Sequence, residues 1–565
     1  MGAVEVVEDT VLAQRDTYLA DNPTQHLHHL SADVAALWPK IDHLLYLPIL
    51  GLTRPRDLYY YQGAGLTALY GFTYKYLTLE HFLGQLTRVQ VGAPLAEALA
   101  ITYAQAWYPG HDPLPLFADW HIKPHWTKSY SHAGHVAMWG RTMPGTKQLI
   151  LTAPAGRLLG GWNYPIDTHL SHILVDLEAG LEHTLGRPIA CSITDSEGGG
   201  LPLGERYAEA KRNYISILPQ EQAYCRADFV LESCWELVKG DPERKAAFAH
   251  WTDSKRAAED PRRFVLMRPV GQAEPTRIYS GRFSDDLTAG QVPWLHRRRW
   301  ANNELRIRDL IHGANLNANY GYTYEETPNR TRQREWEEAQ AKVAVTERQL
   351  SNHQEAVRNL RRRLANLQDT YATQHRGLEC QLAQHRLDLR RRQRLGKATT
   401  RAQQRVDRLR RELTAHTERF QRRQRSLLQQ LHHHKTKSRQ LRERLSRRIA
   451  ARDAIDTETL CRERDLEKDQ IMLNWQTLLA NLHDRAAQTY FAPEWRTLSL
   501  EKATQMIYRK AGRVTWYHDR IEVMLEPYRY RDQQQAMQAT CARFNAANVR
   551  WRDGRLLRIS VAPPG

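Results

Sequence analysis

The chain has 565 residues, which is too long for one hydrophobic core and predicts several domains. Its 41% hydrophobic and 25% charged residues are typical of a folded protein, and no stretch approaches the ~20 consecutive apolar residues of a membrane-spanning helix. With 81 Lys and Arg against 63 Asp and Glu, the net charge of +18 favours a polyanionic partner, nucleic acid first and an acidic membrane surface second. The lack of a long apolar stretch argues against the membrane.

The chain also carries no pattern of secretion or of a cysteine framework. Residues 1–10 are acidic and lack the basic-then-apolar order of a secretory signal. The six cysteines lie far apart without a C-x-x-C pair, so neither disulfides nor a cysteine zinc site is predicted. We therefore expect a cytoplasmic protein.

The first part of the chain predicts a helical domain followed by an α/β domain. Residues 1–112 contain helical patterns, for example at 78–86 and 95–107. From residue 113 to 325, short β-type runs alternate with helical ones, which indicates a mixed α/β sheet. A Pro- and Gly-punctuated β-rich region at about 219–292 is interpreted as an insertion on that sheet, and a helix is expected at 297–312.

Residues 330–470 shift to a composition rich in Arg, Gln, Leu and Glu, with apolar residues seven apart. This spacing predicts a coiled coil with a break near Gly396. Two helices folded back as an antiparallel hairpin are the simplest interpretation, and a parallel coil between two chains is the alternative. The seam consists of Val343, Leu350, Val357, Leu364, Tyr371 and Leu378, then Val406, Leu413, Phe420, Leu427 and Leu441.

The tail, residues 471–565, returns to a globular pattern. A β-hairpin is predicted at 514–526, a helix at 533–548 and a strand at 556–561. Together these elements indicate a small C-terminal α+β unit.

Three acids fall on predicted apolar faces. Asp119 shares a strand face with Phe117, and Asp195 ends a second strand run. Glu304 lies in the apolar stripe of the expected helix at 297–312, together with Trp300. Charged groups on such faces are costly unless they are compensated.

Divalent cations would supply that compensation if the three acids meet. Oxygen-only ligands suit Mg²⁺ or Mn²⁺ better than zinc. Taken singly, Asp119 and Asp195 are more often turn formers or helix caps, and Glu304 could pair with Arg308. Their joint order of strand, strand and helix favours a shared metal site.

Four segments resemble the acidic motifs of insertion-sequence DDE transposases, which belong to the RNase H-like superfamily. They are residues 116–123 (LFADWHIK), 192–198 (SITDSEG), 299–305 (RWANNEL) and 316–322 (LNANYGY). The first aspartate of such proteins is commonly followed by Gly-His, whereas Trp120 and His121 follow it here. The second is often followed by Arg-Glu, whereas Ser196 and Glu197 stand here.

The resemblance implies that Asp119, Asp195 and Glu304 hold two Mg²⁺ or Mn²⁺ ions in an RNase H-like domain. It implies metal-dependent cleavage at transposon ends and strand transfer into target DNA. The expected partner is double-stranded DNA, the expected assembly a homo-oligomer, with a dimer favoured, and the expected location the bacterial nucleoid. A catalytically inactive DNA-binding protein of transposase descent and an endonuclease without joining activity are the alternatives.

Basic residues are candidates for contact with DNA phosphates. The N-terminal helices are candidates for recognition of the DNA end. The individual candidates are Lys123 and Lys128 after the first acid, Arg361, Arg362, Arg390, Arg391, Arg422 and Arg423 in the coil, and Arg513 and Arg529 in the tail.

Overall fold

Segments that are distant in the sequence share one structural unit. In the computed structural model, Met1–Glu326 and Arg462–Gly565 form one unit, here called the sheet unit, and Thr327–Cys461 form a second, the hairpin unit. The structure describes residues 2–31, 33–61, 67, 70, 74–126, 133–218, 226–321, 324–458 and 460–563.

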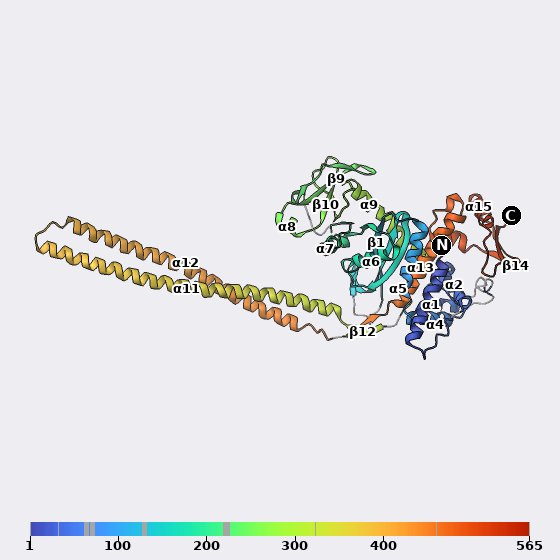
Figure 1. Cartoon of the computed structure of the whole chain (residues 1–565), viewed down its shortest axis with the longest axis horizontal. Helices are drawn as coiled ribbons and strands as arrows, with labels where there is room; N and C mark the ends of the chain where they lie inside the picture. Colours follow the sequence, from blue (N-terminus) through green and yellow to red (C-terminus); the bar gives the residue numbers. More distant parts are fainter. Residues whose placement is uncertain are drawn as a thin grey trace. The chain divides into compact units, whose positions relative to one another are not determined.

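A mixed β-sheet organises the sheet unit, as the sequence predicts (Figure 1). Its central strands run in the order β4-β3-β1-β5-β6. β1, β3 and β4 are antiparallel neighbours, whereas β5 lies parallel to β1 and β6 parallel to β5. Parallel neighbours need crossover connections: α7 connects β5 to β6, and the path from β1 to β5 passes through the antiparallel strands and then α6. The bounds are β1 (Leu114–Pro124), β3 (Arg141–Ala153), β4 (Arg157–Pro165), α6 (Leu170–Leu185), β5 (Ile189–Ile193), α7 (Leu201–Glu209) and β6 (Tyr214–Ile217); β2 (Ala133–Val136) pairs with β3 at the edge.

Alternating side chains in β1 divide the core between the two sheet faces. Leu116 and Ala118 pack in a cluster with leucines of α6. Phe117 packs in another cluster with Ile193 of β5. Because strand side chains alternate, Asp119 lies on the Phe117 face, as predicted from its spacing.

The expected insertion extends this sheet beyond β6. β11 pairs antiparallel with β6, and β10 and β9 follow in order. Aromatic rings fill the outer core, where Phe229 stacks on Trp251 at 4.7 Å between ring centroids. The bounds are β7 (Phe229–Leu231), β8 (Glu236–Val238), β9 (Asp241–Trp251), α8 (Ser254–Glu259), β10 (Arg263–Pro269) and β11 (Arg277–Arg282).

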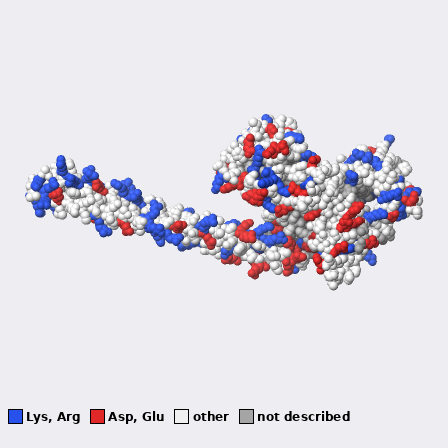
Figure 2. Space-filling view, in the orientation of Figure 1, with Lys and Arg blue, Asp and Glu red and all other residues white. Residues whose placement is uncertain are grey.

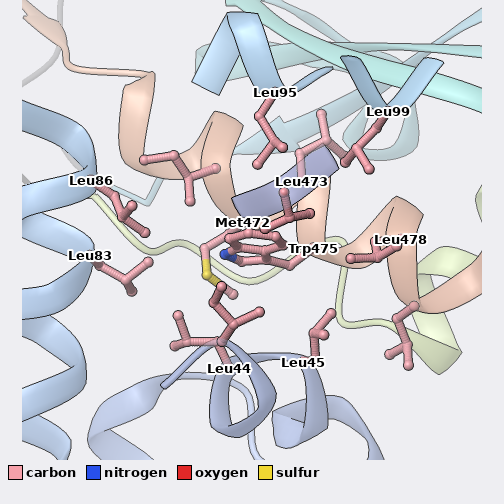
Figure 3. Close-up of a cluster of buried hydrophobic side chains, with 14 of the residues drawn as sticks. Leu44, Leu45, Leu83, Leu86, Leu95, Leu99, Met472, Leu473, Trp475 and Leu478 are labelled. Atoms are coloured by element: carbon pink, nitrogen blue, oxygen red, sulfur yellow. The ribbon is translucent and has the colours of Figure 1, made fainter. Parts of the chain in front are cut away.

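Helix α13 (Glu467–Tyr490) is the centre of the main hydrophobic core. It is buried over most of its circumference, which is typical of a helix with neighbours on every side. Figure 3 shows Trp475 of this helix among leucines of three N-terminal helices. Those helices are α2 (Val34–Leu50), α4 (Tyr76–Arg88) and α5 (Gly92–Trp107), and α1 (Ala3–Asp21) packs with them.

This core changes the expected domain organisation. Residues 1–112 do not build a core of their own, because their leucines share one cluster with α13. The expected boundary at residue 470 falls within α13, so the coiled coil ends earlier than predicted. Long-range packing, which no local pattern reveals, sets both boundaries.

The hairpin unit contains the predicted antiparallel helix pair. α11 (Arg330–Arg394) and α12 (Thr400–Asp453) are joined at Gly396, whose φ of +64° favours glycine. Tyr371 hydrogen-bonds Thr417 at 3.2 Å, and Arg448 donates to the Lys342 carbonyl oxygen at 2.7 Å. The first contact joins the middles of the two helices, and the second joins the start of α11 to the end of α12, so the pair is antiparallel within one chain (Figure 1).

The C-terminal elements form as predicted and pack onto the end of α13. β14 and β15 are antiparallel, and β16 lies parallel to β15. Ala487 of α13 shares their core with Met537. The bounds are α14 (Leu500–Ala503), β14 (Gly512–Trp516), β15 (Arg520–Leu525), α15 (Arg531–Ala546) and β16 (Leu556–Val561). Across the described part of the chain, no helix has the length and apolar character needed to cross a membrane.

A buried glutamate in α6 gives a pH-dependent prediction. Glu178 accepts hydrogen bonds from the Ser192 and Tyr207 hydroxyls, and burial raises its pKa from 4.5 to about 7. Because the pKa of Glu178 is higher in the folded chain than in the unfolded chain, this residue contributes folding stability below pH 4.5. That contribution is lost as the pH rises through 7. Glutamine does not ionise, so the Glu178→Gln variant should not lose this stability. From pH 5 to pH 8, the free energy of unfolding of the variant should therefore rise relative to that of wild type by on the order of 2 kcal/mol.

Urea denaturation at the two pH values measures this difference. The same substitution at exposed Glu205 is the control, since that carboxylate stays in water. An equal response of Glu178→Gln and wild type to pH would contradict the buried, raised-pKa assignment.

Candidate active site

Asp119 lies in the middle of β1 with its carboxylate directed toward helix α9 (Gln291–Arg299). Arg299 at the end of that helix forms an ion pair with it, and the Trp120 amide donates to Oδ1 at 2.9 Å. Burial raises the pKa of Asp119 to about 7, against the opposing effect of Arg299. The charges of Asp195 and Glu304 raise it further, so the three acids are electrostatic neighbours.

Asp195 directly follows β5 and caps the short turn η4 (Ser196–Gly199). Its Oδ1 accepts a hydrogen bond from the Glu197 amide at 3.0 Å. Burial raises its pKa, and Arg299 opposes that shift. His296 of α9 donates to the Thr194 carbonyl oxygen at 3.0 Å, which holds this loop against the helix.

Glu304 ends a π-helical turn, η6 (Trp300–Glu304), between α9 and α10 (Leu305–Gly313). In this turn the Leu305 amide donates to the Trp300 carbonyl oxygen, five residues earlier. Residues five apart therefore lie above one another, which places Arg299 beside Glu304 at 2.5 Å. The same turn leaves Trp300 60% exposed, so its predicted place in the buried stripe is wrong.

Asn303 pins the π-helical turn to the sheet. Its Nδ2 donates to the Phe117 carbonyl oxygen at 2.8 Å and to the Ile150 carbonyl oxygen at 3.1 Å. The residue is fully buried, and its two acceptors lie on neighbouring strands. Asn303 was missed in the sequence, although an amide directly before an acid on an apolar helix is a recognisable polar anomaly.

Arg299 is the cation that the three acids share. Its two Nη atoms contact Asp119 and Glu304, and its charge acts on Asp195. The side chain is mostly buried, so these charge interactions are only weakly screened by solvent. Taken singly, Glu304 was expected to pair with an arginine such as Arg308, whereas in the structure its partner is Arg299.

The three acids supply a donor set that a hard divalent cation could use, and in the structure Arg299 neutralises two of them. All three acids supply oxygen ligands, which Mg²⁺ and Mn²⁺ prefer. Within the described ranges, no three His, Cys, Asp or Glu side chains are spaced to hold one ion as they stand. Metal binding at Asp119 and Glu304 therefore requires the Arg299 guanidinium to leave them.

Lys147 extends the charged cluster on the side of Asp195. Its Nζ donates to the Thr168 carbonyl oxygen at 2.8 Å and lies 3.3 Å from Glu197 Oε1. It also lies 5.0 Å from the ring centroid of Trp120. Its charge lowers the pKa of Asp195 against the effect of burial. Lys147 was not predicted, because β3 reads as an apolar strand.

The predicted phosphate-binding residues divide into buried and exposed ones. Lys123 is only 2% exposed and pairs with Asp469 at 3.2 Å, so it is a core residue and not a surface contact for DNA. Lys128 lies outside the described residues. The exposed candidates are Arg361, Arg362, Arg390, Arg391, Arg422, Arg423, Arg513 and Arg529. Figure 2 shows Lys and Arg along the visible face of the hairpin unit, interspersed with Asp and Glu.

Comparison with known proteins adds no relative. No protein-family model matches the chain, and no curated protein matches it significantly. The functional argument therefore depends on the geometry of the site.

Proposed function

We propose that the chain is a DDE-type transposase that cleaves DNA at transposon ends and joins them to target DNA. The observation that carries the proposal is that the Arg299 guanidinium pairs with both Asp119 and Glu304 and that its charge also acts on Asp195. The three acids come from a central strand, the end of the neighbouring parallel strand and a helix far along the chain. Carboxylates that are largely removed from water and influence one another are costly unless cations compensate them.

The sheet supports an RNase H-like assignment. Three antiparallel strands followed by two parallel ones, in the order β4-β3-β1-β5-β6, correspond to the strand arrangement of that superfamily. Asp119 lies on the central strand of this order, and Asp195 follows its parallel neighbour. The insertion at β7 to β11 leaves this arrangement intact, because it is added at the β6 edge.

Asp119, Asp195 and Glu304 would hold two Mg²⁺ or Mn²⁺ ions. When bound, the ions would supply activation of water or a 3′-hydroxyl and stabilisation of the leaving oxygen in an in-line displacement. The protein residues position these ligands: Asn303 fixes the Glu304 turn, and His296 fixes the loop before Asp195. Arg299, once displaced, is a cation available to a DNA phosphate.

A catalytically inactive DNA-binding protein is the second candidate, and one observation favours it. Arg299 already neutralises Asp119 and Glu304, so the acid cluster is compensated without metal. An endonuclease without joining activity would use the same residues. The proposed partner in each case is double-stranded DNA, contacted by exposed arginines of the hairpin unit, and the proposed assembly is a dimer at the nucleoid.

One assay separates the three candidates. The purified full chain is incubated with labelled duplexes that carry candidate element ends, with Mg²⁺, with Mn²⁺ or with EDTA. The proposed function predicts cleaved and joined products only with metal. Cleavage without joining would identify the endonuclease, and binding that yields no product in any buffer would identify the inactive protein.

A further inference from the structure

A charged cavity lies in the sheet unit beside α10, the helix that follows Glu304. Its volume is about 500 Å³. α10, the start of β4, the end of α13 and the loop before α14 form its walls. Five cationic and three anionic side chains line it. We call the paired side chains Arg157, Arg306 and Asp484 its floor, and the exposed cations Arg308, Arg496 and Lys502 its rim.

Ion pairs fix the floor of the cavity. Asp484 accepts from Arg157 at 2.8 Å and from Arg306 at 2.6 Å, so one carboxylate holds two walls together. Asp309 accepts from the backbone amides of Leu500 and Glu501, each at 3.2 Å. These contacts hold α14 against α10 and neutralise the cations of the floor.

The cations of the rim are different. Arg308, Arg496 and Lys502 are exposed, and none of them forms an ion pair with a described residue. Of the three anionic side chains that line the cavity, only Glu501 is left to offset these three cations, so the rim keeps a net positive charge that attracts an anion. Arginine forks match phosphate oxygens in a bidentate way, and lysine adds a point charge.

We infer that this cavity binds a backbone phosphate of the DNA strand near the cleavage site, an inference that rests on the proposed function. Arg308 follows Glu304 by four residues on one helix, a rise of about 6 Å. The site therefore lies within roughly a nucleotide or two of the acids. The cations that form no ion pair lie at the rim, where a DNA backbone could pass. The cations of the floor are already neutralised, so a small anion enclosed in the cavity would gain little from them.

The test compares two double variants of the full chain in DNA binding. Arg496→Ala with Lys502→Ala removes two rim cations, and Lys211→Ala with Lys255→Ala removes two exposed cations elsewhere in the sheet unit that form no ion pair with a described residue. Binding of a labelled duplex in Ca²⁺ is measured from 50 to 300 mM salt. The rim variant should lower the slope of log K against log salt by about 1, and the control should leave it unchanged.

The outcomes are separable. Duplex binding by wild type with equal slopes for both variants overturns the phosphate site while the proposed function stands. No duplex binding by wild type overturns both. A free phosphate-containing anion is the alternative ligand, and calorimetry with pyrophosphate tests it. If wild type binds pyrophosphate saturably, the rim variant does not, and the salt dependence of DNA binding is the same for both, the cavity binds a free anion instead of DNA.

Discussion

Replacement of Asp119 by asparagine is expected to reduce metal-dependent DNA cleavage by at least ~10³-fold, a loss of about 4 kcal/mol of transition-state stabilisation. Asparagine has nearly the same shape but lacks the charge that holds a divalent ion. Asp119 is the acid whose pKa both other acids influence, so it is central to the cluster. Product formation under single-turnover conditions in Mg²⁺ measures the effect.

Asp241→Asn is the matched control for this substitution. The Asp241 side chain is 15% exposed, close to the 14% of Asp119, and pairs with Arg297 of the same helix at 2.9 Å. It lies at the start of β9, in the insertion. If the two variants lose cleavage equally, the loss comes from disturbance of α9, and the metal-ligand role of Asp119 is contradicted.

Asp469→Asn is expected to destabilise the sheet unit by about 3–5 kcal/mol. Asp469 is fully buried and pairs with Lys123 at 3.2 Å and Arg464 at 2.7 Å. Burial raises its pKa, but these two cations outweigh burial and hold it below its usual range. Without the carboxylate, the two buried cations lose the negative charge that both of them share at the start of α13. Urea denaturation followed by tryptophan fluorescence measures the change.

The exposed pair of Asp553 and Arg555 provides the contrast. Asp553→Asn removes a surface ion pair of the same type, which is expected to contribute less than about 1 kcal/mol. If Asp469→Asn and Asp553→Asn lower the free energy of unfolding by similar amounts, the network of Lys123, Arg464 and Asp469 does not stabilise the start of α13 as its buried contacts indicate.

The strands and the coil could be predicted because their causes are local. Alternation placed Asp119 on the Phe117 face, and the structure agrees. The seven-residue spacing predicted the seam, in which Val343 and Val406 are buried. Aromatic and histidine contacts also join the two helices: Tyr371 stacks on Phe420 at 4.0 Å between ring centroids, and His353 contacts His434 at 2.8 Å.

The environment of the acids could not be predicted, because it depends on distant segments. The π-helical turn that brings Arg299 to Glu304 is anchored through Asn303 to β1 and β3, nearly 200 and over 150 residues earlier. An ideal α-helix would have put Trp300 in the buried stripe. Lys123 was mistaken for a surface residue because its partner, Asp469, is far away in the sequence, after the whole hairpin unit.

The most direct test of the central claim is the cleavage activity of Asp119→Cys in Mg²⁺ and in Mn²⁺. A sulfur ligand binds Mg²⁺ poorly and accepts the softer Mn²⁺ more readily. If Asp119 holds a catalytic ion, the variant is inactive in Mg²⁺ and regains part of its cleavage activity in Mn²⁺. Equal activity of the variant in the two metals, or wild-type cleavage that persists in EDTA, would contradict the claim.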